Sequence, residues 1–229
     1  IRTIEGFSDR VVSLAFSPDG KLLATGGGPP TLDGEIRIYE AATGKLILDL
    51  KNSHSDQVFG VCFSPDGKKL ATCGADKFVK TWEVPTGKFI KSFEGHTHHV
   101  MDVVWKGDGK LLASCGADNV IKIWDFAKGE QTRSSGGHGK QVTRLQFAGK
   151  TSTFVTCSGD QTVRTWNVDN GRSTRSFSGN KDFLYAVAIS PDAQMISAGG
   201  EEGVVRVWDN RGRLLKTLTP TEPTTTKKK

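Results

Sequence analysis

The chain contains 229 residues, of which 36% are hydrophobic and 27 are glycine, and it carries a formal net charge of +6. This is the composition of a globular domain, which excludes collagen, coiled coil and intrinsic disorder, and no run of 18 apolar residues predicts a transmembrane helix. The basic residues are spread along the sequence without the dense basic and aromatic stripe of a nucleic-acid interface, so we expect no nucleic acid and no membrane among its partners.

The predicted elements begin with a β-strand over residues 1–6. The sequence IRTIEG there resembles FIKSFEG at residues 89–95, and it shows no charged and then apolar leader, as in an excised domain or a processed chain. Units of four strands follow. In residues 100–134, strands are predicted at 100–105, 111–115, 120–124 and after a turn at 127–130. Strands every 8–12 residues, with SPDG turns and no helical period, predict an all-β fold.

One unit repeats every 42 residues. This spacing relates four tryptophans, three cysteines, and a series of three histidines and one asparagine: Trp82, Trp124, Trp166 and Trp208; Cys73, Cys115 and Cys157; His54, His96, His138 and Asn180. A lone four-stranded sheet would expose both faces, whereas radially placed sheets bury them against their neighbours, which predicts a β-propeller. Five four-stranded blades are expected at about residues 7–50, 51–92, 93–134, 135–176 and 177–219, followed by a disordered Pro/Thr/Lys tail at 220–229.

The third copy carries the residues of a known repeat. It reads GH at 95–96, LLAS at 111–114, Asp118, and IKIWD at 121–125. Five such copies in register make residues 1 to about 219 similar to the WD40-repeat β-propeller family. The resemblance implies a rigid, non-enzymatic scaffold for protein–protein interaction, without a cofactor, which binds a protein or peptide on the top face of the propeller.

The resemblance also implies a hydrogen-bonded tetrad in each blade. Its members, by position, are His54, Thr72, Asp76 and Trp82 in the second copy, His96, Ser114, Asp118 and Trp124 in the third, and His138, Thr156, Asp160 and Trp166 in the fourth. Three equivalent sets argue for a structural role, and no catalytic residue is predicted. The end copies depart from the pattern, so we expect them to be held less tightly; they carry Phe7, Thr25, Asp33 and Tyr39, and Asn180, Ala198, Glu202 and Trp208.

Two rings of side chains at the top of the channel are the candidate partner-binding residues. By resemblance, the ring at the start of each first strand grips partners; it consists of Val12, Phe59, Met101, Thr143 and Tyr185. Two positions earlier lies a mostly polar collar, which consists of Arg10, Gln57, His99, Gln141 and Phe183. Partly exposed Phe, Met and Tyr side chains are typical interface anchors. The alternative is that Phe59 and Met101 are buried blade packing.

The strand count bears on whether the ring is closed. Five blades and the strand at residues 1–6 give twenty-one strands, and by its sequence that extra N-terminal outer strand belongs to a preceding blade. We therefore hypothesise the C-terminal part of a larger, seven-bladed propeller. The alternatives are a five-bladed ring with a spare strand, or an open arc that self-associates through ends that expose apolar blade faces.

The remaining motifs predict no metal site. Cys62 and the repeat cysteines show no CxxC spacing, so we expect free thiols, which favour a reducing, cytoplasmic compartment. His98 and His99 lack a carboxylate or cysteine at ligand spacing. A basic residue two positions before each third-strand aromatic is expected to pack its stem and direct its charge outward; these residues are Arg37, Lys80, Lys122, Arg164 and Arg206.

One alternative function comes from the turn sequences. The SPDGK turns and the ATGK and PTGK hairpins resemble bacterial WD40 regions, some of which are fused to c-type cytochrome domains. In that case the chain is a haem-free accessory region of a periplasmic redox protein, since it contains no CxxCH motif. A haem-attachment motif upstream of Ile1 in the parent gene would decide between the two functions.

Overall fold

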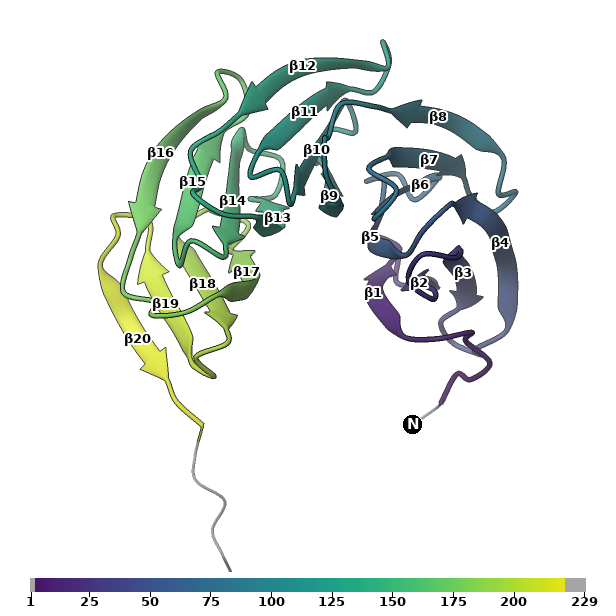
Figure 1. The fold of residues 1–229 in the computed structure, drawn as a ribbon, viewed down its shortest axis with the longest axis horizontal. Helices are drawn as coiled ribbons and strands as arrows, with labels where there is room; N and C mark the ends of the chain where they lie inside the picture. Colours follow the sequence, from purple (N-terminus) through teal and green to yellow (C-terminus); the bar gives the residue numbers. More distant parts are fainter. Residues whose placement is uncertain (1–2, 221–229) are drawn as a thin grey trace, which may run out of the picture.

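The computed structural model describes residues 3–220, which form twenty β-strands in five four-stranded antiparallel sheets (Figure 1). In every sheet consecutive strands are neighbours. Blade 1 contains β1 (Val11–Phe16), β2 (Leu22–Gly27), β3 (Gly34–Glu40) and β4 (Leu46–His54). Blade 2 contains β5 (Val58–Phe63), β6 (Lys69–Gly74), β7 (Val79–Glu83) and β8 (Phe89–Phe93), and blade 3 contains β9 (Val100–Trp105), β10 (Leu111–Gly116), β11 (Ile121–Asp125) and β12 (Glu130–Ser135). Blade 4 contains β13 (Val142–Phe147), β14 (Thr153–Ser158), β15 (Val163–Asn167) and β16 (Arg172–Phe177), and blade 5 contains β17 (Leu184–Ile189), β18 (Met195–Gly200), β19 (Val205–Asp209) and β20 (Leu214–Leu218). The predicted all-β architecture of five four-stranded blades is confirmed.

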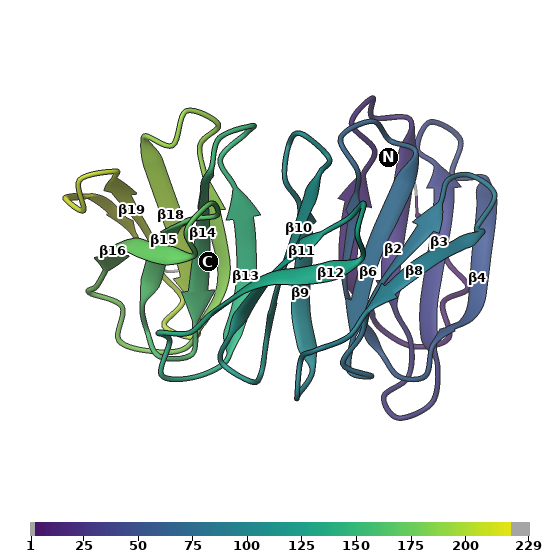
Figure 2. The same ribbon diagram turned by 90° about the horizontal axis from the view of Figure 1, so that it is seen from above.

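The blades stand side by side around a channel, in chain order. The first strand of each blade lines the inside of the arc and the fourth strand lies on its outside, and the arc is open between blade 1 and blade 5 (Figure 1). In the side view of Figure 2 the loops lie along the two opposite faces of the arc, at the upper and lower edges of the blades. We call the face that carries the loops before the first strands the top.

The first strand of each later blade closes the junction with the blade before it. Between blades 2 and 3, Val100, Val103 and Trp105 of β9 pack with Cys73 and Phe93 of blade 2. All five side chains are at most 6% exposed. Burying a side chain of this size contributes about 1.5–3 kcal/mol, so these junctions hold the arc together.

Of the strand predicted over residues 1–6, the described residues 3–6 are not in a strand. Residues 3–10 belong to no strand, while residues 1–2 and the predicted tail from residue 221 onward lie outside the described residues. An outer strand needs a third strand to hydrogen-bond with, and every third strand described already pairs with the outer strand of its own blade. The carbonyl of Gly6 instead accepts a hydrogen bond from Arg37 Nη1 over 2.6 Å. The described residues thus contain twenty strands rather than twenty-one.

Candidate functional site

Blades 2, 3 and 4 each contain a chain of buried hydrogen bonds that crosses the sheet. In blade 4, the Trp166 indole donates to the Thr156 hydroxyl over 2.8 Å, that hydroxyl lies 2.8 Å from His138 Nε2, and His138 Nδ1 lies 2.9 Å from Asp160. Since Nδ1–H donates to the carboxylate, Nε2 accepts from the hydroxyl. Equivalent contacts of 2.8–3.0 Å join His54, Thr72, Asp76 and Trp82 in blade 2, and His96, Ser114, Asp118 and Trp124 in blade 3.

Burial and hydrogen bonding set the protonation of the tetrads. Burial lowers the pKa of His54 and of His138, so both imidazoles are neutral at pH 7. Burial alone would raise the pKa of Asp160, but hydrogen bonds from Thr162, from a backbone amide and from His138 bring it down to about 2. The Thr156 hydroxyl that links the group belongs to a residue with no exposed surface. No substrate can reach it, so the tetrad holds the blade together.

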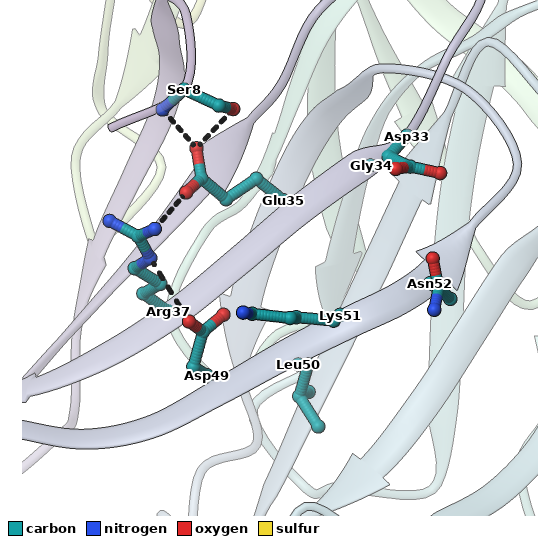
Figure 3. A pocket seen from close by; sticks show the side chains of 9 residues that line it. All are labelled: Ser8, Asp33, Gly34, Glu35, Arg37, Asp49, Leu50, Lys51 and Asn52. Atoms are coloured by element: carbon teal, nitrogen blue, oxygen red, sulfur yellow. Dashed lines mark hydrogen bonds and ion pairs between the residues drawn. The ribbon is translucent and has the colours of Figure 1, made fainter. Parts of the chain in front are cut away.

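Blade 1 replaces the tetrad with an ion-pair network (Figure 3). Phe7 takes the histidine position, where its ring lies 6.1 Å from that of Tyr39 and 5.4 Å from the Arg37 guanidinium. Arg37 pairs with Glu35 over 2.5 Å and with Asp49 over 3.6 Å. Charge pairing and ring packing thus hold this blade in place of a histidine.

The predicted carboxylate of blade 1 is not the one that the structure uses. Asp33 lies at the edge of a hollow of about 270 Å³, apart from the network drawn in Figure 3. Glu35 takes its place and also accepts from the amide and the hydroxyl of Ser8, over 3.2 and 3.0 Å. The enlarged loop at residues 28–33 moves the carboxylate by two positions, so alignment by repeat spacing selects the wrong residue.

Blade 5 also departs from the tetrad. Arg206 donates to both oxygens of Glu202, over 2.6 and 2.9 Å, and to the Asn180 side chain over 3.3 Å. Ala198 supplies no hydroxyl to this group. An arginine–carboxylate pair therefore replaces the histidine–carboxylate pair of the inner blades.

The repeated basic position does not direct its charge outward, contrary to expectation. Lys80 donates to the Ser53 carbonyl over 2.8 Å, and Lys122 donates to Gln131 over 2.8 Å. Arg164, like the arginines described above, also bonds to a neighbouring side chain. A polar acceptor lies within hydrogen-bond distance of each ammonium or guanidinium group. These cations therefore pair with groups of their own or the neighbouring blade and form no basic ring around the particle.

A β-bulge begins the first strand of every blade, and it places one side chain at the mouth of the channel. In blade 2, Val58 pairs with Gly74 and Gly60 pairs with Cys73, so Phe59 is the unpaired extra residue. A bulge turns such a residue out of the regular alternation of the strand. The five bulge residues are the predicted partner-binding ring: Val12, Phe59, Met101, Thr143 and Tyr185.

The bulge residues converge on one hollow of about 390 Å³, which we call the mouth hollow. Its lining consists of Val12, Phe59, Met101, Gln141, Thr143, Arg144, Phe183 and Tyr185. Seven of the ten residues predicted for partner binding therefore lie together. Arg10, Gln57 and His99 are not part of the lining, and Arg144 was not predicted.

Two of the predicted contact residues are used within the fold. Gln57 is 5% exposed, and its side-chain amide donates to the Gly28 carbonyl of blade 1 over 2.7 Å. Thr143 is 7% exposed, and its hydroxyl donates to the Leu184 carbonyl of blade 5 over 2.8 Å. These two side chains join neighbouring blades, because a buried amide or hydroxyl must be paired.

Two aromatic rings at the start of β17 in blade 5 are held in place by contacts within the fold. The rings of Phe183 and Tyr185 lie 5.1 Å apart, and Tyr185 donates to Glu201 over 2.7 Å. Phe183 lies against Gly159 of blade 4, where an added Cβ would come within 2.3 Å of its ring. Tyr185 is 52% exposed, so a large aromatic surface is held rigidly at the rim.

The fold and this geometry agree with the sequence comparisons. Residues 57–227, about three quarters of the chain, match the family described as the IFT122 first beta-propeller, and residues 1–40 match the WD domain, G-beta repeat. The chain belongs to the WD40-repeat β-propeller family. None of the curated proteins matches the sequence. Neither matching family concerns a cytochrome, so the predicted link to bacterial cytochrome-fused regions gains no support.

As a WD40 protein, the chain has a fold that in general serves as a non-enzymatic scaffold for proteins or peptides. Within residues 3–220, no three His, Cys, Asp or Glu side chains gather in a way that could hold a metal. No helix among the described residues has the length and apolarity needed to span a bilayer. All four cysteines are unpaired, and burial raises the pKa of the Cys157 thiol to about 12.

Proposed function

We propose that this WD40 chain is a non-enzymatic scaffold that holds a protein or peptide partner in the mouth hollow. The observation that carries the proposal is the convergence of five bulges, one from each blade, on a single hollow. A bulge recurring at every first strand presents side chains from rigid elements, which limits the ordering entropy that binding costs. Phe59, Met101, Phe183 and Tyr185 supply aromatic and sulfur-containing surface of the kind enriched in interfaces.

The test is selection from a phage-displayed random peptide library on the immobilised chain. We expect enriched peptides to lose binding to the double variant Tyr185→Asp/Phe59→Asp, while the thermal melt of that variant changes little. Leu46→Asp is the matched control, because Leu46 is 46% exposed on the outer strand β4, away from the hollow. The proposal would be refuted if the wild-type chain, the double variant and the Leu46→Asp control captured the selected peptides equally, or if no peptide were enriched on the wild-type chain.

We further propose that the chain is one part of a larger propeller. The supporting observation is a blade face that is exposed in blade 1 but buried at the equivalent positions of blade 2. Val11, Leu14 and Phe16 are 37%, 64% and 64% exposed, whereas Val58, Val61 and Phe63 are 0%, 6% and 6% exposed. The opposite face of blade 5 is open as well, with Val205 and Leu218 at 41% and 46% against 0% and 1% for Val79 and Phe93. Apolar faces of this kind are covered by neighbouring blades elsewhere in the fold, and uncovered they drive association.

Light scattering on a sizing column tests the open faces. We expect the isolated chain to associate with rising concentration and Leu14→Glu/Phe16→Glu to run at the monomer mass of 24.8 kDa with an unchanged melt. Leu46→Glu/Phe89→Glu, on outer strands with similar exposure, should associate as the wild type does. A monomeric wild-type chain at all concentrations would contradict the proposal.

A further inference from the structure

The mouth hollow contains a single charged side chain, Arg144. Arg144 follows the bulge residue of β13, and its side chain is 34% exposed. The equivalent positions of the other blades carry Ser13, Gly60, Asp102 and Ala186. Blade 4 alone therefore contributes a cation at this position of the channel wall.

The hydrogen-bonding capacity of Arg144 is mostly unused. The one hydrogen bond of its guanidinium within the described residues runs from Nη1 to Asp102 Oδ1 over 3.3 Å, longer than the 2.7–2.9 Å of a strong charge-assisted bond. Asp102 is already satisfied by two backbone amides, those of Val103 and Leu145, each at 3.0 Å. A guanidinium has five N–H donors in a planar fork that matches a carboxylate. Donors thus remain for a second carboxylate, supplied by a ligand in the hollow.

The walls around Arg144 are apolar at blades 2 and 3 and acidic at the rim of blade 5. Phe59 and Met101 belong to the lining, and neither carries a charge. Glu201 binds Tyr185, and Asp182 adds negative charge beside the same ring. A ligand carboxylate is therefore attracted toward Arg144 and repelled from the rim of blade 5, where an uncharged side chain packs better.

We propose that the hollow binds an internal peptide segment in which an acidic residue, held by Arg144, stands beside an aliphatic or aromatic residue packed between Phe59, Met101 and Tyr185. This inference rests on the mouth hollow being the partner-binding site. The hollow of about 390 Å³ is within the range of small-ligand sites and suits a few side chains rather than a folded domain. Its lining reaches from Val12 in blade 1 to Tyr185 in blade 5, so an extended segment can cross it with both ends outside.

The experiment uses the library peptides selected on the wild-type chain. We expect them to share Asp or Glu adjacent to Leu, Ile, Met or Phe. A labelled peptide of that kind, followed by fluorescence anisotropy, should bind about ten- to a hundredfold more weakly when its acid is changed to the amide, because a hydrogen-bonded charge is lost. This arm leaves the protein unaltered and is independent of its folding.

Two protein variants locate the carboxylate. The charge-neutral pair Asp102→Asn/Arg144→Gln should weaken the acidic peptide as much as the amide change does, and should bind acidic and amide peptides equally. Asp102→Asn alone frees Arg144 from its counter-ion and should tighten the acidic peptide several-fold. Thermal melts of both variants must remain cooperative, and only folded variants enter the comparison.

The other outcomes are distinguishable. Peptides that require Tyr185 and Phe59 but carry basic or purely apolar motifs would overturn this inference and leave the scaffold proposal standing. If binding requires a free C-terminal carboxylate on the peptide, the hollow does not bind an internal segment and that part of the inference is overturned. Peptides that bind equally to the Tyr185→Asp/Phe59→Asp variant would overturn the binding site itself.

Discussion

The Thr156 hydroxyl is the centre of the blade 4 tetrad, and its removal tests whether the tetrad stabilises the fold. Thr156→Val keeps the shape of the side chain but leaves two buried groups without partners, the Trp166 indole N–H and His138 Nε2. Each buried, unpaired group costs about 1–3 kcal/mol, so the free energy of unfolding should fall by about 2–6 kcal/mol. For a domain of this size, about 4 kcal/mol corresponds to a fall in Tm of roughly 10 °C.

Thr156→Ser is the matched control, because Ser114 makes the same two contacts in blade 3, each at 2.8 Å. It removes one methyl group and should cost about 1 kcal/mol. Urea unfolding of both variants, followed by tryptophan fluorescence at pH 7.5, measures the difference. If the valine and serine variants agree within about 0.5 kcal/mol, the hydroxyl does not stabilise the blade and the reasoning fails.

Three further predictions concern protonation, packing and thiol access. Because burial lowers the pKa of His138 in the folded chain, the unfolded chain binds protons more readily, so the contribution of His138 to the free energy of unfolding should be constant above about pH 7.5 and fall as the pH drops through 6.5; equal guanidinium midpoints at pH 7.5 and 5.5 would contradict this. Gly159→Ala should cost about 1–3 kcal/mol in a thermal or urea melt by overpacking Phe183, and Phe183→Gln in the same chain should recover it, whereas equal destabilisation with and without Phe183→Gln would exclude that contact. The buried Cys157 thiol, with its pKa of about 12, should resist a disulfide reagent at pH 8 until urea unfolds the chain, and rapid labelling of the native protein would count against the packing.

The repeat spacing was sufficient to predict the blades and the residues that the structure brings together in the inner tetrads. A 42-residue period can be read without coordinates, and the side chains it relates, such as His96 and Trp124, have few ways to satisfy their buried polar groups. The strand bounds followed from the turns between them. Residues 3–6 are not in a strand, because sequence similarity to an outer strand does not provide the neighbour with which such a strand must pair.

The candidate site was predicted less completely, for two physical reasons. A β-bulge arises from local register, which the sequence does not display, so the side-chain direction of Phe59 could not be derived from alternation. Whether a polar side chain faces solvent or a neighbouring blade depends on packing between blades, which is why Gln57 and Thr143 were placed at the surface but are buried. Arg144 was missed because its role depends on the hollow that the other blades form around it.

The order of the tetrad along the chain couples each blade to the next. His54 is the last residue of β4, where it pairs with Gly34 of blade 1, and its ring is held by Asp76 of blade 2. The outer strand of one blade therefore cannot separate without breaking hydrogen bonds of its neighbour, so we expect adjacent blades to unfold as a cooperative unit. Within the described residues, the side chain of Asn180, which follows β16, makes only a long hydrogen bond of 3.3 Å with Arg206 and one of 3.1 Å to the Gln161 carbonyl. Under mechanical load or mild denaturant, the arc should part first between blades 4 and 5, at its least cooperative joint.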